Sequence, residues 1–229
     1  MEIYNLFKSN KMYLRFYSLD DVYSFNLDEL NEEKKDFFAW FVPIPYGTVN
    51  GKIKFEGKER EVAGRGYHDH NWGNVPLTKI INHWYWGRLD IGEYKAIFFE
   101  MVADKKYGSE RVNLFMFAKG DEILTGDGSK LTLEKSNYIT HPGGKEYPEQ
   151  LNFNWEDNKD NIKISISNPE LIEDRSLLSG LPFLKRKIAG MIVNPYYFRF
   201  NGKTEININY NDINETIKDK SLYEIMMLK

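Results

Sequence analysis

Cysteine is absent from this chain of 229 residues. Disulfide bonds, thiol catalysis and thiolate metal sites are therefore excluded, and nothing implies an oxidising compartment. Long apolar runs are absent too: no segment approaches the roughly 18 apolar residues of a membrane-spanning helix. The N-terminal "MEIYNLFKSNKMYLRFYSLDD" has no apolar run of signal-peptide length. We therefore expect a soluble, cytoplasmic protein without a transmembrane segment.

An excess of positive charge is also missing. The chain carries 31 Lys and Arg residues against 34 Asp and Glu residues, for a formal net charge of −3. A nucleic-acid binder needs a concentrated basic face. We expect no nucleic-acid partner.

Aromatic residues are abundant, at 15% of the chain. Together with short apolar alternations bounded by Gly, Asn and Asp, they favour strands over a helical bundle. "GTVNGKIKFEGKEREVAG" predicts a hairpin that turns at "EGK". Further turns are expected at "DIGE", "KGDE", "GDGS", "DNKDN" and "NGK". This regular spacing predicts an all-β fold, as an antiparallel barrel or a sandwich.

Two segments depart from the strand pattern. The charge-rich residues 28–36 predict a solvated loop or helix end. Residues 172–193 predict either one or two short helices across a barrel mouth or an irregular crossover, and the basic run 184–187 within them raises a peripheral membrane contact as a minority interpretation. We expect His141 in a loop and Trp155 in the core.

Histidine is scarce, yet three of the four histidines lie close together. Two occur in "GRGYHDHNWGN", residues 64–74, and His83 opens "HWYWGR". On a strand, alternation separates two faces: Val62, Gly64, Gly66, His68, His70 and Trp72 share one, and Tyr67, Asp69 and Asn71 the other. If Val62 faces the core, the imidazoles are buried and need hydrogen-bond partners. A bulge at Gly64 and Gly66 would instead exchange the faces.

The next hairpin repeats this alternation. Trp84, Trp86 and Arg88 share one face, and Phe98 and Glu100 share a face of the following strand. The register of the "DIGE" turn decides whether the tryptophans meet this pair or the pair on the opposite face, Ile97 and Phe99.

Three chemistries fit these residues. A metal site would use His68 and His70 with His83 or Asp69, but the spacing matches no zinc pattern, so we expect no metal. Acid–base catalysis would use His70 with Asp69 or Glu100, and nearby indole faces would stabilise a cation. The remaining interpretation is a hydrogen-bonded network that locks two strands. In either of the last two cases we expect residues 68–72 to be mostly buried.

The motif "GRGYHDHNWG" followed by "WYWGR" resembles the hydroxyneurosporene synthase family, also called carotenoid 1,2-hydratase-like or AttH-like proteins. The segments "WFVPIPYGTVNGKIKFEG" and "SLYEIMML" add to the resemblance, which covers about residues 37–229. It implies lipocalin-like β-barrels, and it extends to tocopherol-cyclase-like proteins and lipocalin-like cyclases.

Only some 60 residues precede the motif, too few for an eight-stranded barrel of ordinary strands. We therefore expect residues 1–75 to form a reduced N-terminal β region, a small open sheet, and residues 76–229 to form a lipocalin-like barrel. The open edge would pair with a second protomer, giving a homodimer, or be blunted by residues 28–36.

The resemblance also implies site residues. In the hydratases the second histidine and the tryptophan of the motif act with a downstream Tyr-x-Asp. The histidine and the tryptophan correspond to His70 and Trp72. The nearest match to Tyr-x-Asp is "FFE", with Phe98 and Glu100, which lacks the hydroxyl.

The predicted function is that of a cofactor-independent hydratase or cyclase, a hydro-lyase in the first case, acting on an isoprenoid or other apolar molecule. An acid would protonate an alkene, and aromatic faces would stabilise the carbocation. The expected catalytic residues are His70, Trp72, Glu100 and Asp69. The expected ligand contacts are His68, Tyr67, Asn71, His83, Trp84, Trp86, Arg88 and Phe98. The alternatives are a non-catalytic binder of an apolar ligand and a pericyclase-like cyclase.

Overall fold

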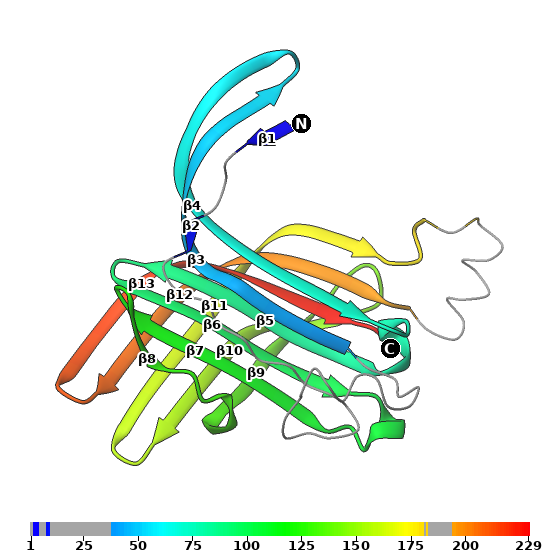
Figure 1. Cartoon of the computed structure of the whole chain (residues 1–229). Helices are drawn as coiled ribbons and strands as arrows, with labels where there is room; N and C mark the ends of the chain where they lie inside the picture. The colour runs from blue at the N-terminus through cyan, green and yellow to red at the C-terminus, as the bar shows by residue number, and fades with distance from the viewer. Residues whose placement is uncertain (1, 5–7, 10–37, 181, 183–193) are drawn as a thin grey trace, which may run out of the picture. The chain divides into compact units, whose positions relative to one another are not determined.

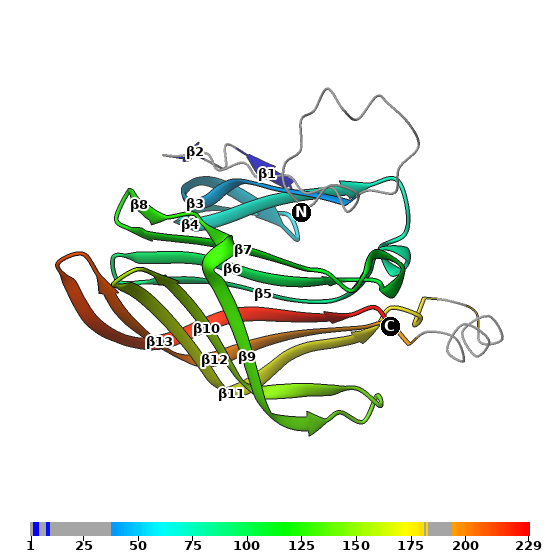
Figure 2. The ribbon, with the colours of Figure 1, turned by 90° about the horizontal axis from the view of Figure 1, so that it is seen from below.

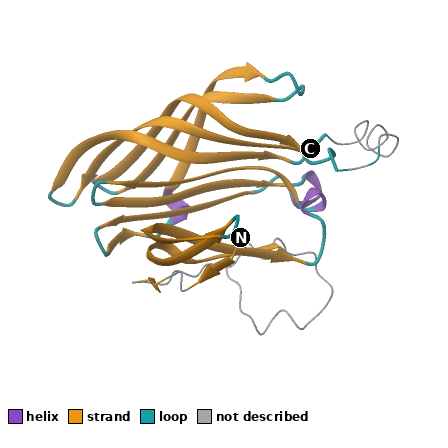
Figure 3. Ribbon diagram, turned by 90° about the horizontal axis from the view of Figure 1, so that it is seen from above, coloured by secondary structure: helices purple, strands orange, loops and turns teal. Residues whose placement is uncertain are grey.

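The structure is a computed structural model that describes residues 2–4, 8–9, 38–180, 182 and 194–229. It divides into two units, Met1–Pro76 and Leu77–Lys229, next to the division expected after residue 75. Strands dominate both units (Figure 3), and the expected all-β class is confirmed. The segment 28–36 and most of the expected crossover, 183–193, lie outside the described residues. No described helix is long and apolar enough to cross a membrane.

The described strands of the first unit form one antiparallel sheet of four. They are β1 (Glu2–Tyr4), β2 (Lys8–Ser9), β3 (Phe38–Phe55) and β4 (Lys58–Gly73). β3 pairs with each of the other three. The long β3–β4 hairpin (Figure 1) turns where "EGK" predicted it, with Glu56 and Gly57 at positive φ.

Two bulges interrupt β3 beside the motif strand. The register with β4 shifts between Phe41 and Ile44 and again between Ile44 and Gly47, and each shift adds one residue to β3. Pro43 and Pro45 occupy these stretches, and proline has no N–H to give to the ladder. The bulge considered at Gly64 and Gly66 of β4 thus lies on the partner strand instead.

The described strands of the second unit form a nine-stranded antiparallel meander. Its strands are β5 (Ile81–Ile91), β6 (Tyr94–Ala103), β7 (Arg111–Lys119), β8 (Glu122–Thr125), β9 (Leu131–Thr140), β10 (Glu146–Asp157), β11 (Asp160–Ser176), β12 (Tyr196–Tyr210) and β13 (Ile213–Met227). Each strand pairs with its neighbours in the chain, and β13 returns to pair with β5, so that β8 and β9 end the sheet (Figure 2). The described residues of this unit also include three short 3-10 helices: η2 (Leu77–Lys79), η3 (Lys105–Tyr107) and η4 (Gly128–Lys130).

The helix η4 joins the two ends of this sheet. Asn113 Nδ2 on β7 donates to the carbonyl of Leu131 at 2.7 Å, and the indole of Trp155 donates to the carbonyl of Asp127 at 2.9 Å. A Cβ atom on Gly128 would lie 2.3 Å from the carbonyl oxygen of Asn113. Close backbone approach at Gly128 therefore brings β7 against the start of β9.

The inward faces of the second unit form an aromatic core. Its fully buried rings are Phe98, Phe117, Phe153, Phe198, Phe200 and Tyr223. Phe200 stacks on Tyr223 with ring centroids 5.0 Å apart, and Phe98 meets Phe153 at 4.5 Å. Trp155 is 3% exposed, which confirms its expected place in the core.

Two sequence predictions are wrong in this unit. The "NGK" segment does not turn: β12 continues through Gly202, and the turn follows at Asn211, which has φ of 51°. Gly202 instead makes room within the sheet, because a Cβ there would lie 2.4 Å from Ile166 and 3.0 Å from Tyr223. The expected helix or crossover from residue 172 is, up to Ser176, the continuation of β11.

We predict that Gly128→Ala destabilises the protein by about 1–3 kcal/mol, because the new methyl group would overlap backbone that cannot move away cheaply. Gly64→Ala is the matched control, since a Cβ atom at Gly64 would have no neighbouring atom within 4 Å. Urea unfolding of both variants checks this. Equal midpoints for the two would contradict the close approach at Gly128.

Candidate functional site

One face of β4 holds a hydrogen-bonded group around Asp69. The indole of Trp40 on β3 donates to Asp69 Oδ2 at 2.8 Å, and the hydroxyl of Tyr67 donates to the same oxygen at 2.9 Å. Asp69 is half-buried. Because both donors converge on its carboxylate, Asp69 joins β3 to β4 on this face.

The other face of β4 carries the imidazoles. His70 stacks on Trp72 with ring centroids 5.3 Å apart. His68, His70 and Asn71 are exposed, while Trp72 is half-buried, so the prediction that residues 68–72 are mostly buried is wrong for three of them. Since neighbouring strand residues point to opposite faces, Asp69 faces Trp40 and Tyr67 and does not orient His70.

The described residues contain no group of three His, Cys, Asp or Glu side chains able to hold a metal ion. His68 and His70 share a face of β4, and His83 belongs to the second unit. The catalytic set expected from the sequence is likewise divided between units: His70, Trp72 and Asp69 lie in the first, and Glu100 lies in the second.

A buried charge cluster surrounds Glu100 inside the barrel of Leu77–Lys229. Glu100 is 2% exposed. Its Oε1 accepts from Lys135 Nζ on β9 at 2.7 Å and lies 3.0 Å from Arg111 NH1 on β7. The Lys135 ammonium also lies 4.7 Å from the centre of the Tyr85 ring. Glu100 is therefore engaged in two ion pairs, one with Lys135 and one with Arg111.

The sheet register places Tyr85, Glu100 and Asn113 in one inward-facing row across β5, β6 and β7. Phe98 shares this face and is fully buried. Trp84, Trp86 and Arg88 point to the opposite face of β5, where Trp84 pairs with Met101 and Trp86 with Phe99. The tryptophans therefore do not face Glu100.

His83 lies beside this row. Its ring meets the ring of Tyr85 edge-on at 5.6 Å. Burial, aided by the charge of Lys135, lowers the pKa of His83 from 6.5 to about 4. The imidazole is therefore neutral at physiological pH. Its Nδ1 lies 2.7 Å from Asn82 Oδ1; with the proton on Nδ1 for this bond, Nε2 is an acceptor.

Three tyrosines point into the barrel, and their hydroxyls form no hydrogen bond with a described residue. Tyr85, Tyr147 and Tyr223 are 5%, 8% and 1% exposed. Within the described part of the chain, none of their hydroxyls forms a hydrogen bond with protein. Burial raises the pKa of each phenol above its usual range, so each remains an O–H donor.

Several of these residues were not found from the sequence. Tyr85 lies two residues after His83 and therefore shares its face of β5, and this alternation could have identified Tyr85 from the sequence. Lys135, Arg111, Asn113, Tyr147 and Tyr223 carry no local signal, because barrel closure brings them to the site.

His141 occupies the β9–β10 loop, as predicted, but it is packed among rings. It lies 5.1 Å from Phe198 and 5.3 Å from Tyr196, measured between ring centroids. Its Nδ1 accepts from the backbone N–H of Gly143 at 3.0 Å, and its Nε2 lies 3.5 Å from Asp174 Oδ2. This histidine therefore links the β9–β10 loop to the end of β11.

The Svf1 family matches residues 16–225 of the chain. The quinolone epoxide rearrangement protein asqO of Emericella nidulans is 34% identical over 104 residues, which cover 45% of this chain and 24% of that protein. The ceramide-binding protein SVF1 of Candida albicans is 24% identical over 142 residues, 59% of this chain and 37% of that protein. The chain thus spans about a quarter to a third of the length of these two relatives.

Among solved structures, kievitone hydratase from Nectria haematococca has a TM-score of 0.50 at 14% identity, over 85% of this chain and 54% of that one. This likeness shows a lipocalin-like fold and nothing of the activity. The expected assignment to the hydroxyneurosporene synthase family is not confirmed by these matches.

We predict that lowering the pH from 7.5 to 4.5 destabilises the native protein more than it destabilises the His83→Gln variant. The folded pKa of His83, about 4, lies below its unfolded value of 6.5, so the unfolded state takes up the proton first. Stability that is complete above pH 6.5 is therefore lost as the pH falls towards 4. Urea unfolding of both proteins at pH 7.5 and pH 4.5 measures the difference. Equal losses in the two proteins would show that His83 is not desolvated.

Proposed function

The chain belongs to the Svf1 family, and we propose that the barrel of Leu77–Lys229 binds an apolar small molecule that carries a hydrogen-bonding group. The observation that carries this proposal is the set of inward tyrosines, Tyr85, Tyr147 and Tyr223, whose hydroxyls have no hydrogen-bond partner among the described residues. The relatives support it, since one is a ceramide-binding protein and another a quinolone epoxide rearrangement protein.

A ligand can satisfy these hydroxyls, and each hydrogen bond gained contributes about 1 kcal/mol. Two of the three belong to one aromatic stack: Tyr147 and Tyr223 both contact Phe200, at 4.9 and 5.0 Å between ring centroids. Apolar walls with a few polar groups are typical of small-molecule sites. A ligand hydroxyl or carbonyl would recover the missing hydrogen bonds.

Binding is favoured over acid-initiated chemistry in this barrel. The hydratase or cyclase hypothesis needs a proton donor, yet Glu100 is paired with Lys135 at 2.7 Å and Arg111 at 3.0 Å. His83 is neutral because its pKa is lowered to about 4, chiefly by burial. A neutral imidazole is a weak acid, so His83 is not suited to protonate an alkene at neutral pH.

A catalytic role of the β4 motif is the second candidate function. It is favoured by the exposed imidazole of His70, which stacks on Trp72 at 5.3 Å. Such a pair would act on a reactive apolar substrate without a cofactor. Conversion of a quinolone epoxide that is abolished by His70→Phe, which keeps an aromatic ring on Trp72, would support it; unchanged conversion would remove His70 from the reaction.

The homodimer and the peripheral membrane contact expected from the sequence stay predictions.

We predict that Tyr223→Phe weakens binding of the neutral fluorescent dye Nile red by about 5–10-fold, because a hydrogen bond contributes about 1 kcal/mol. The same change leaves the stability of the free protein unchanged or raises it, since the hydroxyl has no protein partner to lose.

Tyr210→Phe is the matched control. The Tyr210 hydroxyl donates to the carbonyl of Leu124 at 2.6 Å, so its removal lowers stability by about 1 kcal/mol and leaves dye binding unchanged. Fluorescence titration and urea unfolding measure the two quantities. A stability loss in Tyr223→Phe with unchanged dye affinity would refute the binding proposal.

A further inference from the structure

One stretch of the barrel wall has no backbone ladder within the described part of the chain. β7 pairs with β6 along its whole length, but it pairs with β8 only at residues 117–119. β9 pairs with β10 alone and ends the sheet. No backbone hydrogen bond between described residues joins β7 to β9. We call the stretch between residues 111–116 of β7 and residues 133–140 of β9 the seam.

The helix η4 fastens the seam at one end. There Asn113 Nδ2 donates to the carbonyl of Leu131 at 2.7 Å, and Gly128 lies against the backbone of Asn113. From this point β9 runs away from β7 (Figure 2). Beyond Leu131, Lys135 makes the only hydrogen bond or ion pair across the seam among the described residues.

The outer side of the seam reaches solvent. The carbonyl of Asn113 lies beside Gly128, and the carbonyl of Leu131 accepts from Asn113, so the backbone of these residues faces the seam. Alternate residues along each strand present their backbone groups to the same side. Such groups need water where the protein gives them no partner. The side chain of Arg111 at this edge is 58% exposed.

The inner side of the seam reaches the aromatic core. The Lys135 side chain is 15% exposed, and its ammonium lies 4.7 Å from the centre of the Tyr85 ring. Tyr85 belongs to the same buried cluster as Phe98 and Phe115. Displacement of the Lys135 side chain would therefore connect the core with solvent.

Both ends of the barrel are held more firmly than the seam. Near the β9–β10 loop, the ring of Tyr147 lies 5.2 Å from Phe198 and 4.9 Å from Phe200, measured between centroids. At the opposite end, the Tyr210 hydroxyl donates to the carbonyl of Leu124 at 2.6 Å. Opening the first end would separate packed rings, whereas opening the seam requires the movement of one long side chain.

Glu100 keeps a partner when Lys135 moves away. Its Oε1 lies 2.7 Å from Lys135 Nζ and 3.0 Å from Arg111 NH1. A buried carboxylate left without a cation is costly, so the contact with Arg111 lowers the free energy of releasing Lys135. Lysine suits this movement, because its ammonium is strongly hydrated and sits on a flexible four-carbon stem.

We propose that the seam is the route by which a ligand enters and leaves the barrel, and that Lys135 closes it through its ion pair with Glu100. Arg111 has the opposite effect, because it stabilises Glu100 while Lys135 is displaced. This inference rests on the proposed binding function and adds the path of ligand exchange to it. A closure of this kind slows binding and release by the same factor, since it raises the barrier between the two states and leaves their free-energy difference unchanged.

Stopped-flow fluorescence with Nile red on the full chain at pH 7.5 measures both rate constants. We expect Lys135→Met, which keeps an unbranched side chain without the charge, to raise the association and dissociation rate constants together by about 5–10-fold. Arg111→Met is expected to lower both by a similar factor, because release of Lys135 would then leave Glu100 unpaired. Kd stays unchanged in each case. General loosening of the barrel would not produce opposite effects from two cations on one carboxylate.

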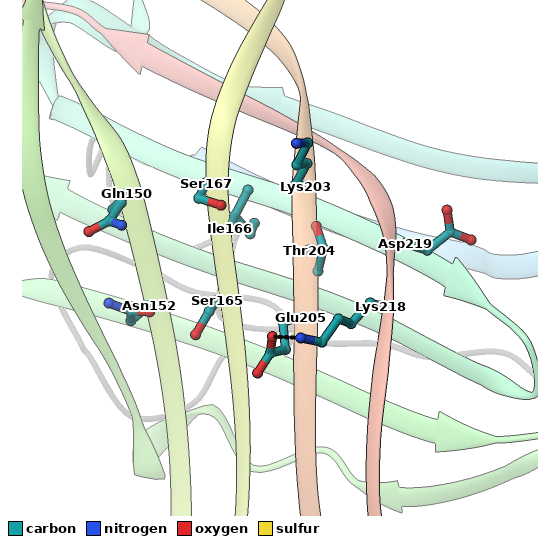
Figure 4. A pocket seen from close by; sticks show the side chains of 10 residues that line it. All are labelled: Gln150, Asn152, Ser165, Ile166, Ser167, Lys203, Thr204, Glu205, Lys218 and Asp219. Carbon is teal, nitrogen blue, oxygen red and sulfur yellow. Dashed lines mark ion pairs between the residues drawn. The ribbon is translucent and has the colours of Figure 1, made fainter.

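Lys218→Met is the matched control. Lys218 Nζ lies 2.7 Å from Glu205 Oε2, the same separation as in the pair of Lys135 and Glu100. Glu205 and Lys218 stand opposite each other on the paired strands β12 and β13, and they line a polar groove on the outer face (Figure 4). We expect native rate constants for this variant, because a backbone ladder joins the two strands.

Circular dichroism checks that each variant folds. If Lys135→Met does not fold, Arg111→Met decides, since its side chain is largely exposed. Unchanged rate constants in Lys135→Met, acceleration in Arg111→Met, or an equal acceleration in Lys218→Met overturns the proposed route and leaves the binding function standing.

Two further outcomes also decide. A changed Kd with an unchanged association rate constant in Lys135→Met would make Lys135 a ligand contact, and this overturns its role in closing the seam. Absence of Nile red binding by the native protein removes the binding function and the route together.

Discussion

The buried carboxylate of Glu100 is the constraint on which the second unit depends. A charge at 2% exposure must be paired, and its partner Lys135 comes from β9, at the far end of the sheet from β6. The ion pair therefore crosses the barrel interior and joins strands that share no backbone ladder. Loss of Lys135 would leave Glu100 paired only with Arg111, whose side chain is largely exposed. Glu100 thus helps to hold the barrel strands together through its ion pairs.

The same pair sets the chemistry of its surroundings. Lys135 adds to the burial that lowers the pKa of His83 to about 4, and its ammonium lies over the ring of Tyr85 at 4.7 Å. A neutral imidazole and a protonated phenol result, side by side at 5.6 Å between ring centroids. Neutral polar groups of the interior thus lie beside the ion pair. This links barrel closure to the binding function that we propose.

The β4 motif is built differently. Asp69 binds Trp40 and Tyr67 through one oxygen and so fastens β3 to β4 beside the bulges at Pro43 and Pro45. His70 and Trp72 occupy the opposite face, where His70 is exposed. The sequence left two interpretations of this motif open, a catalytic cluster and a hydrogen-bonded network that locks two strands. In the structure one face of the strand joins β3 to β4 through Asp69, and the opposite face leaves His70 exposed.

Much of the fold could be read from local patterns. Alternation and turn residues gave the hairpins at Glu56–Gly57 and Gly92–Glu93, and alternation put Phe98 and Glu100 on one face and separated Asp69 from His70. The "NGK" prediction failed because the rule for two-residue turns reads only the local residues, whereas Gly202 is required by the packing of Ile166 and Tyr223 on neighbouring strands.

The sequence by itself determined the all-β class, the strand faces and the absence of thiol chemistry, because each of these follows from residue types and from the period of two along a strand. Only the tertiary structure decided the site. The partner of Glu100 stands 35 residues further along the chain, and the unused hydroxyls of Tyr85, Tyr147 and Tyr223 come from three different strands. Contacts at such separations depend on sheet register and barrel closure, and neither leaves a trace in the local pattern of residues.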